Sequence, residues 1–530
     1  MPVWPKFVYR LNVSLRTADT KRKLRDLHGA PAQQDAAFDS LTRHMANTSH
    51  WKQHGIETGM SYARFQARVP LQSYAEVAPA VEQMKGGNKD VLWPGGCTLF
   101  GQTAGTSSGI SKCLPMTHEL LAHFRRAGFE ALLYYAVRVG NSGVFKGRHL
   151  YYGAPTTLTS PTESPGRPAF VGEVTGIVAL NLPPWVERHL YEPGTAIARV
   201  SPPDAQMAAI ANGTASRDIT LIAGVPNSVA VLTAALRNHS TGEKRASLSL
   251  QERWPNLECF THTGASLAPY AAALRLALGT RVEFHEIYAA SEGLVAVQDG
   301  EPGRGLRVMA DMGLFFEFVS VADFDEFGRD QLGPKTVPLS GVKTNVDYVI
   351  LLTTPGGLAR YVLGDVVRFT SLAPPRLLHV GGTNLRLNAF GENVTERNVT
   401  DSIVALCHRR DWTLMNFHVA PLFAPPSMTG QRRGGHEWWI ELKPGTVVTP
   451  TGPRMALELD ASLREASSGY ATRRRIASMD APVVRLVMPG VFEHWLRFHQ
   501  KWGGQHKMPR CRSDREVANE LTQMTNFARD

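Results

Sequence analysis

The sequence predicts an α/β protein of 530 residues with at least two domains, the larger of which contains a parallel sheet. Apolar runs at residues 149–152, 219–223, 257–260 and 282–287 each precede a polar or Gly-containing loop. Most of these loops lead into a helical pattern, such as residues 228–236. The alternation of strand, loop and helix is typical of a parallel sheet covered by helices. A single core rarely organises so long a chain, which is why a second domain is expected.

The composition excludes several classes of protein. With 43% hydrophobic and 20% charged residues, the chain resembles an ordinary soluble globular protein. We expect no membrane span, because no apolar run approaches the required ~20 residues, and no signal peptide, because the N-terminal stretch has no apolar core. Five scattered cysteines, never spaced C-x-x-C, indicate neither a disulfide framework nor a zinc site. These features favour the reducing cytoplasm.

The net charge of +10 is spread along the chain. Residues 386–530 hold 20 basic and 15 acidic residues, so they carry +5, half of the total. The densest cluster, Arg473 to Arg475, has no interleaved aromatic residues on which nucleobases could stack. We therefore interpret the charge as a solvated basic surface and expect no nucleic-acid partner.

From the N-terminus, residues 1–30 are expected to form a loosely structured lead-in. An amphipathic helix is then predicted from about Asp35, with Phe38, Leu41 and Met45 on one face. Thr117 is expected to cap a helix, because apolar residues follow it at helical spacing.

Beyond the parallel sheet, residues 314–380 have strand character without helices and predict a small β subdomain. A second α/β unit begins after residues 381–384, whose two glycines suit a hinge. The domains are accordingly predicted as 1–385, a large N-terminal domain, and 386–530, a smaller mobile C-terminal cap.

The stretch from Thr103 to Lys112, T-A-G-T-S-S-G-I-S-K, carries the strongest functional signal. Glycines let a backbone fold tightly and bring several N–H groups to one point. The hydroxyls add donors, and Lys112 adds a positive charge. Such a loop suits the phosphates of a nucleotide.

The loop has three other interpretations. The spacing of Gly105, Gly109 and Lys112 does not fit the GxxxxGK[ST] phosphate loop. The loop does fit G-x-S-x-G, which would make Ser107 the nucleophile of a hydrolase. That motif needs a helix directly after the serine, and Pro115 would break such a helix. The third interpretation is an ordinary surface loop.

Four further motifs follow in order. They are Thr263-Gly264-Ala265 after the run at 257–260, Tyr288-Ala289-Ala290-Ser291-Glu292-Gly293 after the run at 282–287, Tyr361-Val362-Leu363-Gly364-Asp365-Val366-Val367-Arg368, and Gly503-Gly504-Gln505-His506-Lys507-Met508-Pro509-Arg510. Taken singly, each has a structural interpretation. The second suits a helix N-terminus capped by Ser291 or Glu292, the third a hairpin with an exposed aspartate, and the last a solvated basic tail.

Together, these five motifs resemble those of the adenylate-forming enzymes, the superfamily of acyl-CoA synthetases, NRPS adenylation domains and luciferase. The Ser/Thr/Gly-rich loop is most similar to that of the acyl-acid amido synthetases, the auxin-responsive promoter family. The resemblance extends from about residue 33 to 515, with the motifs in the family's order. One departure is Val362, which stands where the family usually has arginine.

The resemblance implies the adenylate-forming fold and a role for each motif. Phosphate groups of ATP would be held by the loop and its lysine, and the base and ribose by the later motifs. The implied nucleotide-binding residues are Thr103, Gly105, Thr106, Ser107, Ser108, Lys112, Thr263, Gly264, Ala265, Tyr288, Ser291, Asp365 and Arg368. Tyr288 would stack on adenine, and Asp365 would accept hydrogen bonds from both ribose hydroxyls. Glu292 would hold Mg²⁺, and Lys507 would neutralise charge during adenylation, so that Glu292 and Lys507 are the implied catalytic residues.

The sequence thus predicts an ATP-dependent ligase that adenylates a carboxylic acid and transfers the acyl group to an amine, with an amino acid as the expected amine. An acyl-CoA ligase with a thiol acceptor is the alternative within this chemistry. A hydrolase at Ser107 and a nucleic-acid-binding protein belong to other classes. The cofactors are ATP and Mg²⁺, and the partners are a small carboxylic acid and an amine. The identity of both substrates and the oligomeric state stay open, with a monomer slightly favoured.

Overall fold

The computed structural model describes residues 6–103, 112–160, 168–238, 249–326, 332–424, 434–443, 451–503 and 506–527. These residues form two compact units. The first unit holds the described residues up to Gly264, together with Arg275–His379. The second holds Ala265–Leu274 and the described residues from Val380 onward.

Within the described part of the first unit, a twelve-stranded sheet runs in the order β12-β11-β13-β14-β15-β10-β9-β8-β7-β6-β3-β5. One half is parallel, as the sequence predicts. It contains β3 (Arg148–Tyr152), β5 (Tyr191–Glu192), β6 (Ile219–Gly224), β7 (Cys259–His262) and β8 (Glu283–Ala290). The loops that follow these strands lie at their carboxyl ends, where ligands of such sheets bind.

The other half of the sheet is antiparallel. It contains β9 (Gly293–Val297), β10 (Leu306–Val308), β11 (Phe315–Ser320), β12 (Val337–Pro338), β13 (Asp347–Thr353), β14 (Tyr361–Leu372) and β15 (Pro375–Gly382). β8 joins the halves, since it pairs in parallel with β7 and antiparallel with β9. The strands predicted as a β subdomain therefore continue the main sheet. A short helix, α14 (Val321–Glu326), interrupts the stretch in which only strands were expected.

The N-terminal residues are more ordered than the sequence suggested. α1 (Lys6–Lys23) packs along α6 (His118–Val139), burying Tyr9 and Val13, and Thr20 Oγ1 donates a 2.7 Å hydrogen bond to Glu130 Oε1. The prediction of a loose lead-in was wrong because these long-range contacts leave little trace in the local pattern. Thr117 caps α6 as predicted, accepting a hydrogen bond from Leu120 N through its hydroxyl.

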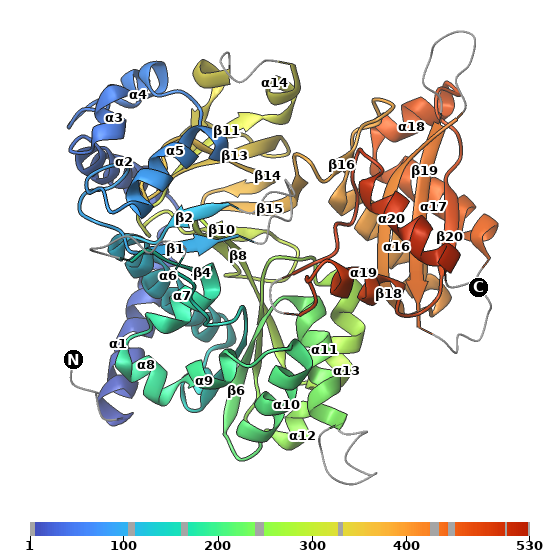
Figure 1. Ribbon diagram of the computed structural model, residues 1–530, viewed down its shortest axis with the longest axis horizontal. Coiled ribbons are helices and arrows are strands. Elements are labelled where there is room, and N and C mark those ends of the chain that lie inside the picture. Colours follow the sequence, from blue (N-terminus) through green and yellow to red (C-terminus); the bar gives the residue numbers. More distant parts are fainter. Residues whose placement is uncertain are drawn as a thin grey trace. The chain divides into compact units, whose positions relative to one another are not determined.

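Four N-terminal helices cover the antiparallel half of the sheet. They are α2 (Ala30–Met45), α3 (Ser49–Gln53), α4 (Tyr62–Arg68) and α5 (Tyr74–Lys85), and Figure 1 shows them in blue beside β11 and β13. Phe38 of α2 contacts Phe315 of β11 with ring centroids 5.0 Å apart. α2 begins at Ala30, earlier than the predicted Asp35, because Pro31 suits the first turn of a helix.

Further helices accompany the parallel half. They are α7 (Val174–Leu180), α8 (Pro184–His189), α9 (Thr195–Ala198), α10 (Pro203–Gly213), α11 (Pro226–Asn238), α12 (Leu250–Arg253) and α13 (Ala271–Leu278). α11 packs against β3 and β6. A separate small sheet contains β1 (Leu99–Gln102), its antiparallel neighbour β2 (Cys113–Pro115) and its parallel neighbour β4 (Phe170–Glu173).

A fully buried arginine stands directly before β14. Arg360 adopts a left-handed backbone conformation with φ of 47°, and its guanidinium pairs with the buried Glu317 of β11, with Nε 3.1 Å from Oε1. The remaining guanidinium nitrogens donate to the carbonyl oxygens of Gln66, Val69 and Gly333 and to Thr336 Oγ1. Because these donors are satisfied, the arginine fixes the chain at the start of β14.

The second unit is built on a sheet of β18 (Leu414–Phe423), β19 (Gly434–Leu442) and β20 (Val483–Val487), which has helices on both faces. Trp438 and Ile440 of β19 pack with α16 (Glu396–Arg410) and α17 (Gly452–Ala466). Trp439 packs with α19 (Val491–Phe498) and α20 (Glu516–Phe527). The unit also contains β16 (Arg386–Leu387), β17 (Val394–Thr395) and α18 (Ser468–Arg475).

Among the helices that the structure describes, none combines the length and apolar character needed to cross a membrane.

Candidate active site

The described ends of the Ser/Thr/Gly-rich loop lie opposite each other. Thr103 and Lys112 follow β1 and precede β2, and two hydrogen bonds join them: Thr103 N to Lys112 O at 2.9 Å and Lys112 N to Thr103 Oγ1 at 3.2 Å. The hairpin therefore holds the loop at its base. Gly105, Thr106, Ser107 and Ser108 lie outside the described residues. Pro115 lies in β2, which leaves no room there for the helix that a hydrolase motif at Ser107 would need.

Lys112 and Glu292 form the charged part of the site. The Lys112 ammonium lies 5.3 Å from the centre of the buried Tyr361 ring, and it acts electrostatically on Glu292. Glu292 stands in the turn between β8 and β9 and is only 5% exposed. Burial raises the pKa of its carboxyl group to about 7, an effect that Lys112 opposes and the nearby Asp365 carboxylate increases. A cation that bound beside Glu292 would therefore lower this pKa and stabilise the ionised carboxylate.

A second group of side chains comes from three strands of the same sheet. The Tyr288 hydroxyl on β8 donates a 2.7 Å hydrogen bond to Asp365 Oδ2 on β14. His379 on β15 places Nε2 3.6 Å from Asp365 Oδ1, and its ring lies 5.3 Å from that of Tyr288. Burial, together with the Asp365 carboxylate, raises the pKa of the Tyr288 phenol well above its ordinary value. Tyr288 is thus a neutral donor that orients the carboxylate.

The remaining predicted residues around the base come from two loops. Thr263 follows β7, and its Oγ1 accepts a hydrogen bond from Ala289 N at 3.4 Å, which joins the two motifs. Gly264 has φ of 81°, a conformation that favours glycine, and Ala265 belongs to the second unit. Ser291 lies in the β8–β9 turn beside Glu292. The interpretation of this motif as a helix N-terminus was wrong, because β9 follows the turn directly.

Arg368 has a different environment from Asp365. Its guanidinium forms a two-point ion pair with Asp347, the residue opposite it on β13, at 2.6 and 2.8 Å. This pair and its hydrogen bonds raise the pKa of Arg368. In the present structure its charge is therefore directed to Asp347.

Lys507 belongs to the second unit and is half-buried. Arg510, three residues later, is buried. Its guanidinium donates to Asn416 Oδ1 and to the Tyr270 hydroxyl, and it lies 4.8 Å from the centre of the Phe417 ring. Arg510 thus holds the C-terminal end of the motif within its unit, and Lys507 precedes it in a stretch that is neither helix nor strand.

The arrangement fits a metal ion that arrives with a nucleotide. Among the described residues, no cluster of three or more His, Cys, Asp and Glu side chains could hold a metal ion alone. Mg²⁺, however, commonly binds one or two carboxylates and completes its shell with phosphate oxygens and water. The desolvated Glu292, beside the ends of the loop, has the chemistry of such a ligand.

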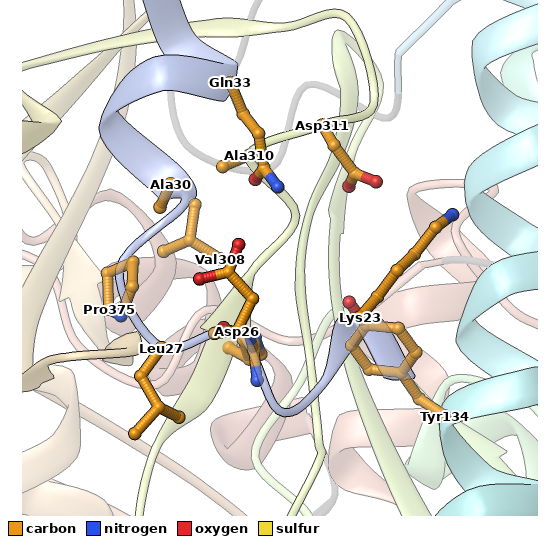
Figure 2. A pocket seen from close by; sticks show the side chains of 11 residues that line it. Lys23, Asp26, Leu27, Ala30, Gln33, Tyr134, Val308, Ala310, Asp311 and Pro375 are labelled. Atoms are coloured by element: carbon orange, nitrogen blue, oxygen red, sulfur yellow. Dashed lines mark hydrogen bonds between the residues drawn. The ribbon is translucent and has the colours of Figure 1, made fainter. Parts of the chain in front are cut away.

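A cavity elsewhere in the first unit does not coincide with these residues. It has a volume of about 30 Å³ and lies between the α1–α2 connection, α6 and the strands β10 and β15, as Figure 2 shows. Lys23, Asp26, Tyr134 and Asp311 line it with charged and polar groups. A cavity of this size holds one or two water molecules, so it cannot receive a nucleotide.

The sequence interpretation missed His379. It lies in the run L-L-H-V-G-G, and a lone histidine in an apolar strand is usually a core residue. The structure instead leaves 34% of its side chain exposed beside Asp365, whose own side chain is 27% exposed. Only the pairing of β14 and β15 in space reveals the contact.

Three models of the GH3 family match the chain: its N-terminal domain over residues 21–192, its central domain over 307–381 and its C-terminal domain over 397–516. A similar relative is the indole-3-acetic acid-amido synthetase GH3.8 of Oryza sativa subsp. indica, with 24% identity over 91% of this chain and 88% of that protein. The jasmonoyl--L-amino acid synthetase JAR6 of Nicotiana attenuata is 27% identical over 46% of this chain and 42% of its own length.

Solved structures share the fold. The AtGH3.15 acyl acid amido synthetase in complex with 2,4-DB matches 99% of this chain and 97% of its own with a TM-score of 0.76 and 18% identity. A 2-hydroxyisobutyryl-CoA ligase in the postadenylation state matches 95% of this chain and 93% of its own with a TM-score of 0.59 and 14% identity. The adenylate-forming architecture expected from the sequence is thus confirmed.

Proposed function

Because this chain belongs to the GH3 family, we propose that it is an ATP-dependent acyl-acid amido synthetase that joins a carboxylic acid to an amino acid. The observation that carries the proposal is the convergence of Lys112, Glu292, Tyr288 and Asp365 in one unit, on motifs that occur in the family's order. One relative is named an indole-3-acetic acid-amido synthetase and another a jasmonoyl--L-amino acid synthetase, which supports an amide product with an amino acid as acceptor.

The reaction has two steps. The carboxylate of the acid attacks the α-phosphate of ATP, so that an acyl-adenylate forms and pyrophosphate leaves. The amine then attacks the activated carbonyl and expels AMP. The enzyme contributes chiefly by positioning the reactants and by stabilising the charge that develops on the phosphates, without a covalent intermediate.

Each residue has a proposed task in the first step. Thr103, Lys112 and the loop between them hold the phosphates, Asp365 receives the ribose hydroxyls, and the Tyr288 ring packs against the base. Thr263, Gly264, Ala265 and Ser291 border the base. Arg368 is paired with Asp347. Its proposed contribution is therefore to hold β14, the strand that carries Asp365, and not to place its own charge on the nucleotide.

Glu292 is the proposed ligand of Mg²⁺, which when bound would screen the phosphate charge. A cation near Glu292 offsets the cost of holding a carboxylate away from water. Lys507 is proposed to add a further positive charge during adenylation, and residues 381–384 are proposed as the hinge between domains 1–385 and 386–530.

The acid is proposed to bind near β4 and α7. β4 pairs in parallel with β1, so that Gln102 stands opposite Glu173, immediately before Thr103. Ile177 and Val174 of α7 pack with Met116, Leu120 and Leu121 into an apolar cluster. An acid with an apolar body suits such surroundings, and indole-3-acetic acid and jasmonic acid, after which relatives are named, are the first to test.

Exchange of labelled pyrophosphate into ATP tests the proposal. Exchange should require both ATP and a carboxylic acid, and the acids that support it should yield amides when amino acids are added. A thioester formed with CoA in place of an amide would assign the chain to the acyl-CoA ligases. Absence of exchange with every acid, under conditions in which the protein is folded, would reject the adenylating reaction.

A further inference from the structure

His379 occupies a position that the proposed catalytic steps do not use. It extends from β15 toward Asp365 on the neighbouring strand β14, and its ring packs against Tyr288 of β8 at an angle of 59° between planes. Both His379 and Asp365 are partly exposed, at 34% and 27% of their side chains. A ligand that reaches Asp365 therefore also meets the imidazole.

The carboxylate of Asp365 can accept hydrogen bonds from more than one neighbour at once. An ionised carboxylate offers about four lone-pair directions, two on each oxygen. The Tyr288 hydroxyl takes one of them on Oδ2 at 2.7 Å. His379 Nε2 lies on the other side, 3.6 Å from Oδ1, which is longer than a hydrogen bond. The two oxygens of Asp365 thus have different neighbours, a phenol and an imidazole.

We propose that His379 recognises one ribose hydroxyl of the nucleotide, the one that donates its proton to Asp365 Oδ1. A hydroxyl that donates at about 2.7 Å still has an oxygen that can accept a hydrogen bond. With Nε2 and Oδ1 3.6 Å apart, a hydroxyl oxygen fits at hydrogen-bond distance from both. The inference rests on the proposed binding of ATP and adds a specificity-determining residue to it.

The geometry makes the two ribose hydroxyls unequal. The hydroxyl at Oδ1 would donate to Asp365 and accept from His379, whereas the one at Oδ2 would meet an oxygen that already accepts from Tyr288. Loss of the first hydroxyl should therefore weaken binding more than loss of the second. His379 must carry its proton on Nε2 to act in this way.

The test measures the dissociation constants of AMP, 2′-deoxyAMP and 3′-deoxyAMP by calorimetry, for the wild type, His379→Leu and His379→Gln. His379→Leu should weaken AMP by about three- to tenfold, the value of a net hydrogen bond. It should leave unchanged the affinity for the one deoxynucleotide that lacks the recognised hydroxyl. His379→Gln, which keeps an N–H donor, should recover part of the preference.

Arg376→Gln is the matched control, because Arg376 lies on the same strand but pairs with Asp299 at 2.8 Å. Arg376→Gln should keep the wild-type ratios between the dissociation constants of the three nucleotides. If His379→Leu weakens all three nucleotides by one factor, or none of them, the inference is wrong while the proposed function stands. If the wild type binds no adenine nucleotide at all, the proposed function fails together with it.

Discussion

The hydroxyl of Tyr288 on β8 donates a hydrogen bond to Asp365 Oδ2 on β14, with 2.7 Å between the two oxygens. Tyr288 is expected at the base of the nucleotide and Asp365 at its ribose. Asp365→Ala should therefore remove the acceptor of the ribose hydroxyls and leave the buried phenol without its partner. Losing hydrogen bonds to a charged group costs about 1.5–3 kcal/mol, so that ATP should bind roughly tenfold to a hundredfold more weakly. Calorimetric titration with ATP measures this change.

Tyr288→Phe serves as the comparison. It keeps the ring and removes only the hydroxyl, so its loss of ATP affinity should be smaller than that of Asp365→Ala. Equal and negligible effects of both changes in folded protein would place the nucleotide elsewhere.

The protonation of Glu292 should appear in the stability of the ligand-free protein. Its pKa in the folded state is about 7, above the ordinary 4.5, so the folded state holds this proton more tightly than the unfolded state. The protonated carboxyl group therefore contributes to the free energy of unfolding. This contribution is fully present below pH 4.5 and is lost as the pH rises through 7. By about pH 8 the loss is on the order of 3 kcal/mol.

Glu292→Gln cannot lose this proton and should escape the penalty. The difference in thermal midpoint between Glu292→Gln and the wild type should grow in favour of the variant from pH 5 to pH 8, in buffer without nucleotide or divalent cations. Scanning calorimetry measures it. A difference that is constant with pH would mean that Glu292 titrates as an exposed carboxyl group does.

The buried pair of Arg360 and Glu317 should be a sensitive structural point. Arg360→Met leaves the Glu317 carboxylate buried without its counter-charge, and breaking a buried pair typically costs about 3–5 kcal/mol. Urea denaturation followed by fluorescence measures the loss. Arg360→Met combined with Glu317→Gln should be less destabilised than Arg360→Met alone, because no unpaired charge remains. If the double variant lost as much stability as Arg360→Met and Glu317→Gln lose together, packing would matter more than charge at this pair.

Lys507 should act in one half-reaction. Negative charge develops on the phosphates during adenylation, and loss of one charge-stabilising donor commonly lowers a rate on the order of a hundredfold to a thousandfold. Lys507→Ala should therefore slow acid-dependent pyrophosphate exchange strongly. Transfer from a supplied acyl-adenylate to the amino acid should be largely spared. Lys501→Ala, in the same unit, is a suitable control, and equal slowing of both half-reactions would give Lys507 a structural role.

Ser107 distinguishes two classes of enzyme. A hydrolase would lose essentially all activity in Ser107→Ala, because the nucleophile is gone. The adenylating enzyme should keep part of its exchange activity, since neighbouring hydroxyls and backbone N–H groups remain in the loop. Mass spectrometry of protein incubated with an activated ester provides a second measurement. An acyl group found on Ser107 would contradict the proposed reaction.

Much of the architecture could be predicted because its signals are local. The strands at residues 219–224, 259–262 and 283–290 are short apolar runs that end at polar loops, and the Thr117 cap has a side-chain signature. The short helix Val321–Glu326 could not be separated from its strand-rich surroundings. α1 depends on contacts with α6 more than one hundred residues away, which no local pattern shows.

The site was predictable as motifs but not as contacts. Asp365 and Glu292 were expected from their neighbours in sequence, whereas the bond from Tyr288 to Asp365 joins residues 77 positions apart. His379 and the position of Lys112 above the Tyr361 ring arise only when distant strands meet. Arg368 was expected at the nucleotide, but its pairing with Asp347 depends on the register of β13 and β14.

The change of strand direction at β8 also bears on how the protein acquires activity. β8 takes one neighbour in parallel and one antiparallel, and its residue Tyr288 bonds to Asp365 of β14, several strands away in the sheet. Pairings between residues so distant in sequence form late, because loop closure must come before their contacts. During refolding from denaturant, helical signal should therefore return well before nucleotide binding. Recovered ATP affinity would report the moment at which the two halves of the sheet are joined.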